Sequence, residues 1–166
     1  MHNKVKDTAF LGLCISLALG LAYIEVLLPP LFASVPGIKM GLPNIILIFL
    51  LYRRSFSAAA TVSLLRMVLV TLLFGNTMAF WYSLAGGVLS MAVMVLLKKL
   101  NFLSVAGVSV AGGVTHNVGQ ILMAMFLMNT AELGYYLIVL AVTGTIAGLL
   151  IGLCAAQLIH RIPTRW

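Results

Sequence analysis

Acidic residues are almost absent from this chain, which contains three of them among 166 residues, against ten lysines and arginines. Charged residues of both signs make up 8% of the sequence, whereas a soluble domain carries about 25%. So little charge, together with 63% hydrophobic residues, excludes an ordinary water-soluble domain. We therefore expect an integral protein of the cell membrane.

Cysteine is equally scarce. Cys14 and Cys154 both lie in apolar runs, with no CxxC spacing and no histidine placed as a metal ligand. We predict that both are packing residues and that the chain holds neither a disulfide nor a metal ion. The GxxxxGK[ST] loop that cradles nucleotide phosphates is also missing, so this chain is not expected to power transport itself. No cofactor is expected.

Breaks at proline, glycine and charged residues divide the chain into apolar segments. The first run, Ala9–Leu28, is longer than the apolar core of a signal peptide, which has about 7–15 residues, and no A-x-A site follows. A membrane-crossing helix needs about 20 apolar residues, so the short second segment reads as a tilted or partly re-entrant helix. We predict one all-α domain, a six-transmembrane-helix bundle with spans at about 8–28, 40–52, 57–74, 78–97, 104–128 and 131–159.

The net charge of +7 does not indicate a nucleic-acid binder, because the basic residues are scattered instead of grouped on one face. They lie at every second segment boundary, as the positive-inside rule requires of cytoplasmic ends. We therefore predict that both termini are cytoplasmic and that the loops around Ser34, Asn76 and Asn129 are external. The residues behind this topology are Lys4, Lys6, Arg53, Arg54, Lys98, Lys99, Arg161 and Arg165.

The segment from Val35 to Asn44 departs most from a regular helix, with two prolines, two glycines, a lysine and an asparagine in ten residues. Irregular backbone does not face lipid, because unpaired N–H and C=O groups in hydrocarbon cost several kcal/mol each. We expect this segment at the membrane rim or along an internal cavity, with Lys39 and Asn44 available to a ligand.

Arg66 lies near the middle of the third segment, about 13 Å along the helix from its external end. An ionisable side chain at that depth is costly, so a role in function is the first hypothesis. The alternative is an internal ion pair, for which only Glu25 and Glu132 lie in the external half, and either would have to reach inward.

The fifth segment carries His116, Asn117 and Gln120, whose spacing of three and four residues predicts one shared helical face. A cavity lining and a set of satisfied interhelical bonds both fit these residues. We predict an electropositive, donor-rich cavity that opens to the outside and takes a small anionic or hydrogen-bonding molecule. Its candidate residues are Lys39, Asn44, Arg66, Asn76, His116, Asn117 and Gln120.

Small residues recur every fourth position in the first and last segments. Such stripes let helix backbones approach closely, which in lipid replaces the missing hydrophobic driving force. For Gly144, Gly148 and Gly152 we favour packing inside the bundle. In the first segment, internal packing and contact with another membrane protein both fit the stripe of Gly12, Ser16 and Gly20.

Three runs, in this order, resemble motifs of the Gx transporter family. Pro36–Asn44 resembles its PG-(V/I)-K-x-G-L-x-N signature, residues 72–76 with 82–87 resemble its central block, and 116–120 resembles its fifth-helix motif. The resemblance covers about residues 8–128, most of the chain. Pro43 stands where we expect a small residue in this pattern.

The family is also labelled heptaprenyl diphosphate synthase component I, yet it is similar to the substrate-binding S components of energy-coupling factor (ECF) transporters. The resemblance implies a six-helix protein with cytoplasmic termini and an external pocket for a vitamin or related micronutrient. It also implies docking, through Gly12, Ser16 and Gly20, against a transmembrane coupling subunit that two ATPases drive.

The alternative function is a non-catalytic membrane subunit of an isoprenoid, quinone or electron-transfer complex. Prenyl chain elongation itself needs Mg²⁺ held by clustered carboxylates, and the acids Asp7, Glu25 and Glu132 are too scattered to form such a cluster. We therefore expect no enzymatic activity from this chain. A channel is disfavoured because the polar residues stop at mid-membrane.

Overall fold

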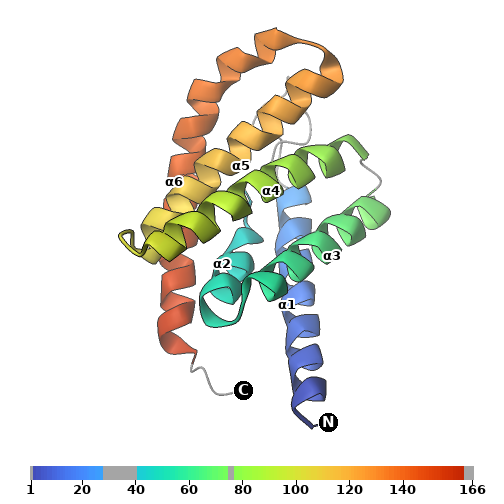
Figure 1. Cartoon of the computed structure of the whole chain (residues 1–166). Helices are drawn as coiled ribbons and strands as arrows, with labels where there is room; N and C mark the ends of the chain where they lie inside the picture. The colour runs from blue at the N-terminus through green and yellow to red at the C-terminus, as the bar shows by residue number, and fades with distance from the viewer. Residues whose placement is uncertain (1, 28–40, 75–76, 163–166) are drawn as a thin grey trace.

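The computed structural model describes residues 2–27, 41–74 and 77–162, and within these ranges it contains helices and no strand. Figure 1 shows the chain as a bundle of helices in which α5 and α6 form a long antiparallel pair. The elements are α1 (His2–Leu27), α2 (Asn44–Arg53), α3 (Phe56–Phe74), α4 (Thr77–Leu100), α5 (Val105–Met128), the 3₁₀-helix η1 (Ala131–Tyr136) and α6 (Leu137–Arg161).

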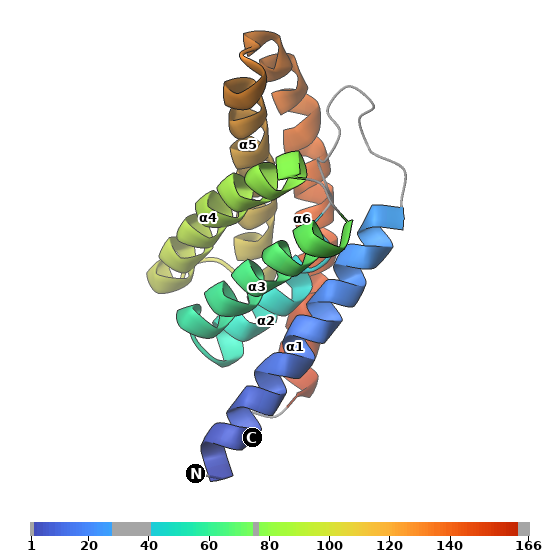
Figure 2. The same ribbon diagram turned by 90° about the vertical axis from the view of Figure 1, so that its right-hand side faces the viewer.

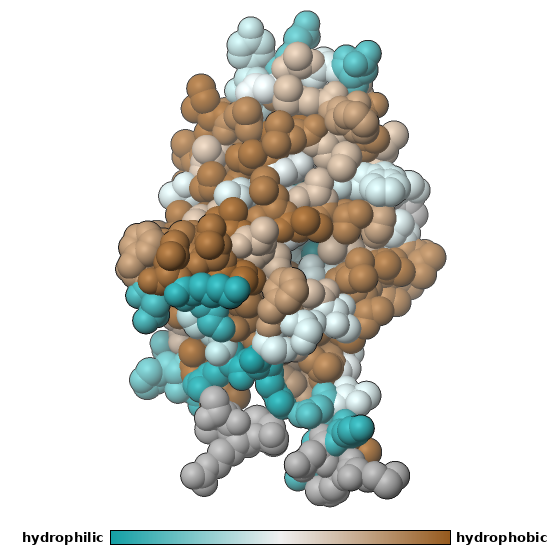
Figure 3. Space-filling model, in the orientation of Figure 1, coloured by the Kyte–Doolittle hydropathy of each residue, from teal (hydrophilic) through white to brown (hydrophobic). Residues whose placement is uncertain are grey.

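Five helical stretches are long and apolar enough to cross a membrane, namely those of α1, α3, α4, α5 and η1 with α6. Large hydrophobic side chains such as Leu72, Phe126 and Ile138 are exposed on them, as expected for surfaces that face lipid. Figure 3 shows a hydrophobic middle, with hydrophilic residues mainly in its lower part and a second group at the top. The prediction of a multi-pass, all-α membrane protein is therefore confirmed.

The second predicted segment, 40–52, corresponds to α2, which begins four residues later than predicted and is short, as expected. The helix begins at Asn44 and has ten residues, so it is about 15 Å long, half the thickness of a typical hydrocarbon core. Gly41 precedes it with a left-handed φ of +85°, and the Asn44 N–H bonds to the Gly41 carbonyl at 2.9 Å. Six full crossings stay a prediction.

Helix α2 lies inside the bundle, where it contacts α1, α3 and α6. All residues from Ile46 to Leu51 are buried, so it is apolar on every side, as expected of a core helix. The other boundaries agree with the sequence to within three residues, except at the start of α1. That helix begins six residues earlier than predicted, because the polar residues that precede the apolar run are also helical.

The last predicted span starts as a different kind of helix. Asn129 ends α5 in a left-handed conformation, and residues 131–136 then form η1 before α6 continues. At the other end of α5, the Ser104 hydroxyl caps the helix by accepting a bond from the Gly107 N–H at 3.2 Å. The predicted start at residue 104 is thus a capping position.

The first turn of α1, the last turn of α6 and the α2–α3 turn lie in the lower half of the molecule (Figures 1 and 2), and Lys98 near the end of α4 reaches this region, where its Nζ donates to the Leu51 carbonyl. We call this region the basic end. The positive-inside rule requires basic residues at one end in this way, and the assignment of that end to the cytoplasm stays a prediction. Its basic residues are Lys4, Lys6, Arg53, Arg54, Lys98, Lys99 and Arg161.

The glycine stripe of α6 packs inside the bundle, as predicted. A Cβ added at Gly148 would lie 2.8 Å from the Val110 Cα on α5, closer than real Cβ atoms approach. The Ser109 hydroxyl donates to the Gly148 carbonyl at 2.7 Å across the same contact. Close approach of the two backbones therefore holds α5 and α6 together, with little room left between them.

Candidate functional site

Buried polar side chains from four helices gather inside the apolar bundle. Glu25 comes from α1, Arg66 from α3, Ser90 from α4, and His116 and Gln120 from α5. None of them exposes more than 7% of its surface, and Gln120 is completely buried. We call these five residues the buried polar cluster.

The cluster contains side chains of opposite charge. Arg66 is attracted electrostatically by Glu25, and His116 lies within range of the Arg66 charge. A Glu25 carboxylate oxygen also accepts a hydrogen bond from the Gly41 N–H, which joins the end of α1 to the turn before α2. Arg66 thus has an acidic side chain within electrostatic range, and Glu25 partly offsets the positive charge that we predicted for the site.

Several buried polar atoms of the cluster have no hydrogen-bond partner among the residues that the structure describes. They are Arg66 Nε, Ser90 Oγ, His116 Nδ1, and both Nε2 and Oε1 of Gln120. A buried polar atom without a partner costs about 1–3 kcal/mol, so several unsatisfied donors and acceptors in one cluster are unusual. Water or a small polar molecule would satisfy these hydrogen-bonding atoms.

Helix α5 brings His116 and Gln120 close to α4 because Gly86 has no side chain. A Cβ at Gly86 would lie 2.6 Å from the His116 carbonyl oxygen and 2.9 Å from Gln120 Cγ. Gly119 makes the reciprocal contact, since a Cβ there would lie 2.8 Å from the Ala85 carbonyl oxygen. Glycine at these positions therefore sets the position of both polar side chains.

A small cavity of about 10 Å³ adjoins the cluster between α2, α4, α5 and α6. Its lining includes Asn44, Ser90, Ser109 and His116. This volume suits one water molecule, whereas pockets for drug-sized ligands measure about 300–1,000 Å³. Helices around this cavity would have to separate before a larger molecule could contact His116 from that side.

The predicted site residues fall into three groups. Asn44, Arg66, His116 and Gln120 lie in or beside the cluster. Asn117 lies on another side of α5, where its side-chain Nδ2 donates to the Leu140 carbonyl of α6 at 2.8 Å. It therefore has the satisfied interhelical bond that was the alternative interpretation. Lys39 and Asn76 lie outside the described residues.

Sequence reasoning overlooked two members of the cluster. Glu25 was considered only as a distant partner for Arg66, yet it is an acid within an apolar run, and the cost of such a residue was signal enough. Ser90 carried no comparable signal, because serine hydroxyls in membrane helices are commonly satisfied by their own helix.

The small-residue stripe of α1 faces outward. Gly12, Ser16 and Gly20 are exposed, and a Cβ added at either glycine would meet no atom within 4 Å. The Ser16 hydroxyl bonds back to the Gly12 carbonyl at 3.0 Å. The alternate stripe, containing Cys14 and Ala18, faces inward and packs in the core. Packing among the described residues thus leaves the outward stripe uncovered.

Comparison with known proteins gives one finding on family. Residues 14–158 match the family described as Heptaprenyl diphosphate synthase component I. This range includes every residue of the buried polar cluster. No curated protein and no solved structure matches the chain.

Proposed function

Because the chain belongs to the heptaprenyl diphosphate synthase component I family, we propose that it is a membrane-embedded binding subunit of an ECF-type transporter, similar to an S component. In this role it captures a small micronutrient, such as a vitamin, from outside the cell. The observation that carries the proposal is the buried polar cluster, whose unpaired atoms lie within an apolar helical bundle.

The cluster supports ligand binding because a merely structural network would satisfy its own members. Asn117 and Ser109, which join α5 to α6, both make good hydrogen bonds at 2.8 and 2.7 Å. Gln120, one turn from Asn117, makes no hydrogen bond with either side-chain polar atom within the described part of the chain. The same helix therefore carries a satisfied side and an unsatisfied side, and a ligand that donates and accepts hydrogen bonds fits the second.

The balance of charge constrains what such a ligand carries. Glu25 already offsets Arg66, so an added anionic group has to compete with the Glu25 carboxylate for the guanidinium. A molecule rich in neutral donors and acceptors fits the amide of Gln120 and the imidazole of His116 without that competition. We therefore favour a micronutrient that binds through neutral hydrogen-bonding groups. An anionic group of the ligand would reach Arg66 only if the Glu25 side chain moved away from it.

Catalysis by this chain is not part of the proposal. Its three acids occupy three different places: Asp7 pairs with Arg54 at the basic end, Glu25 lies inside the bundle, and Glu132 lies in the first turn of η1. Carboxylates so far apart do not bind one Mg²⁺ ion for diphosphate chemistry.

Energy for uptake comes from other proteins in this proposal. The outward stripe of Gly12, Ser16 and Gly20 is a suitable docking face for a transmembrane coupling subunit, which ATPases drive. Its open surroundings support this role, since a partner helix can approach without displacing any side chain of the chain itself.

The family description also supports a second candidate, a non-catalytic membrane subunit of a prenyl diphosphate, quinone or electron-transfer complex. Affinity purification from the native membrane distinguishes the two. Recovery of ATPases with a coupling subunit supports the transporter, whereas recovery of prenyl-transferring or redox proteins without ATPases contradicts it.

The direct test of ligand binding is mass spectrometry of the small molecules that the protein carries through gentle purification. We expect one polar compound to be retained, and Arg66→Ala to weaken its binding at least about tenfold, the loss of one charged hydrogen bond. Val68→Ala, an exposed position on the same helix, is the matched control. Unchanged affinity in Arg66→Ala would remove Arg66 from the site.

A further inference from the structure

A larger cavity, separate from the buried polar cluster, lies at the basic end. It measures about 450 Å³ and is formed between α1 and the turn from α2 to α3. This volume falls in the range of small-molecule sites. Its polar lining comes from Asp7, Arg53, Arg54, Ser55, Ser57 and Thr61.

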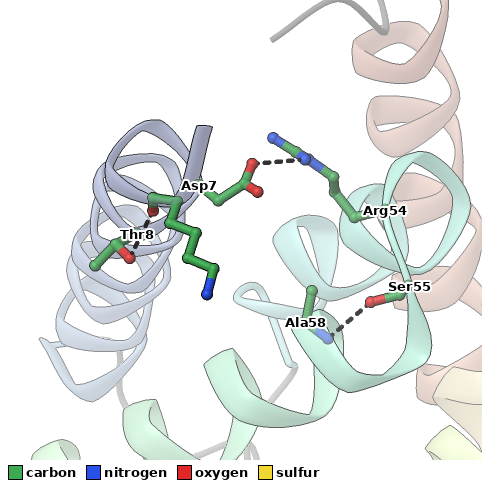
Figure 4. A network of polar contacts seen from close by, with 6 residues as sticks. Asp7, Thr8, Arg54, Ser55 and Ala58 are labelled. Atoms are coloured by element: carbon green, nitrogen blue, oxygen red, sulfur yellow. Dashed lines mark hydrogen bonds and ion pairs between the residues drawn. The ribbon is translucent and has the colours of Figure 1, made fainter. Parts of the chain in front are cut away.

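Two arginines provide most of the hydrogen-bond donors. Arg53 donates through Nη2 to the Ile159 carbonyl of α6, which anchors its guanidinium, while its Nε is buried without a partner among the described residues. Arg54 lies over the Phe10 ring, 4.9 Å from its centroid, and its Nη1 is 3.0 Å from an Asp7 carboxylate oxygen. Figure 4 shows Asp7 on α1 pointing across to Arg54. Both guanidiniums are thus held in place before any ligand arrives.

The start of α3 adds further donors. The Ser55 hydroxyl accepts a bond from the Ala58 N–H at 3.2 Å, drawn in Figure 4, and lies 3.0 Å from the Ser57 hydroxyl. N–H groups in a first helical turn, here those of Phe56 and Ser57, have no acceptor within their own helix. They favour a negative charge at this point.

Charge decides the kind of ligand. The lining carries two guanidiniums and one carboxylate, so one positive charge is not compensated. Asp7 is 52% exposed, and an incoming anion would compete with its carboxylate for the Arg54 guanidinium. The basic end also carries Lys4, Lys6 and Arg161, which raise the local concentration of anions.

We propose that this cavity binds the phosphate group of an anionic ligand through Arg53, Arg54 and the first turn of α3. Arginine forks match the geometry of phosphate oxygens, and a basic cavity between transmembrane helices is suited to a lipid headgroup. A lipid phosphate and a soluble phosphate share this chemistry. The site is independent of the proposed transport function, since it shares no residue with the buried polar cluster.

The test uses the full-length protein in nanodiscs of mixed phosphatidylglycerol and phosphatidylcholine, with the lipids retained after extraction counted by native mass spectrometry. We expect preferential retention of phosphatidylglycerol, reduced about tenfold in Arg54→Gln. Asp7→Asn removes the competing carboxylate and should increase retention. Lys99→Gln removes one exposed positive charge at the same end, away from the cavity, and should leave retention within about twofold.

Calorimetric titration with inorganic phosphate separates the two sources. Heat of binding that is lost in Arg54→Gln, together with displacement of phosphatidylglycerol, assigns the site to soluble phosphates. Phosphatidylglycerol selectivity that phosphate does not reduce assigns it to lipid. Equal retention of both lipids without phosphate binding overturns the proposal. Equal losses in Arg54→Gln and Lys99→Gln, or a loss in Asp7→Asn, overturn it as well. Arg54 and Asp7 are partly exposed, so these variants are expected to fold.

Discussion

Replacing Gln120 by leucine separates ligand binding from structural bonding in the buried polar cluster. Gln120 exposes 0% of its surface, and neither of its side-chain polar atoms has a hydrogen-bond partner in residues 2–27, 41–74 and 77–162. Leucine fills nearly the same space without a polar atom. A residue retained for stability should weaken the fold when its polar group is removed, whereas a residue retained for binding should not.

The expected change in stability follows from the two unpaired atoms. Each costs about 1–3 kcal/mol in a dry environment, and water in the adjoining cavity would recover part of that cost. We therefore expect Gln120→Leu to leave the free energy of unfolding unchanged or to raise it by about 1–3 kcal/mol. Binding of the retained small molecule should fall at least about tenfold, because one buried hydrogen bond to the ligand is lost.

Thermal unfolding in detergent measures the first quantity, and ligand retention by mass spectrometry measures the second. For a chain of this size, 1 kcal/mol corresponds to a shift of about 2–4 °C in Tm. Asn117→Leu is the matched control on the same helix. It removes the 2.8 Å bond to the Leu140 carbonyl, so Tm should fall by an amount equivalent to about 1 kcal/mol, with the ligand still bound.

One pair of results would refute this reasoning. If Gln120→Leu lowered Tm as much as Asn117→Leu and left ligand retention unchanged, Gln120 would be a structural residue. The unpaired atoms of the cluster would then no longer support a binding role, and the transport proposal would lose the observation on which it depends.

Three further predictions concern charge, helix contact and backbone. Glu25→Gln leaves the buried charge of Arg66 uncompensated and should cost about 3–5 kcal/mol in unfolding free energy, whereas adding Arg66→Met should restore most of the lost Tm. Gly12→Leu should keep Tm within about 2 °C, because open space surrounds Gly12, but it should abolish co-purification of a coupling subunit. The same change at Gly148 should prevent folding, because the backbone of α5 occupies the space that the leucine side chain would need. Aggregation in size-exclusion chromatography measures this effect. Gly41→Ala forces a side chain onto a φ of +85° and should cost about 1–2 kcal/mol, measured as a lower Tm. If the coupling subunit still co-purified with Gly12→Leu, the α1 stripe would be a lipid-facing surface and not a docking face. If Gly41→Ala left Tm unchanged, the turn before α2 would be able to relax around the new side chain.

The apolar runs determined the positions of the helices in the chain. A helix is a local structure, and a segment in lipid has to satisfy its backbone within itself, so hydropathy alone placed α3, α4 and α5 to within three residues. Whether α2 crosses the membrane was harder to predict, because ten apolar residues fit a short helix in the protein core as well as part of a membrane-crossing helix. Its complete burial depends on which neighbours surround it.

The candidate site was predictable only in part. Arg66, His116 and Gln120 were identified by the cost of a polar group in lipid, which is a property of each residue alone. The attraction between Glu25 and Arg66 joins residues far apart in sequence, and no local pattern indicates it. Asn117, adjacent to His116 in sequence, bonds to a different helix because successive residues on an α-helix point about 100° apart.

The sequence by itself thus determined that this is a membrane protein, which segments are helices and which few polar residues need an explanation. Only the tertiary structure decided which of those residues meet, which already have partners and which of their side-chain atoms have none among the described residues. The reason is physical: transfer into lipid is a sum over single residues, whereas hydrogen bonding between helices depends on how each helix is rotated and how closely glycine lets two backbones approach.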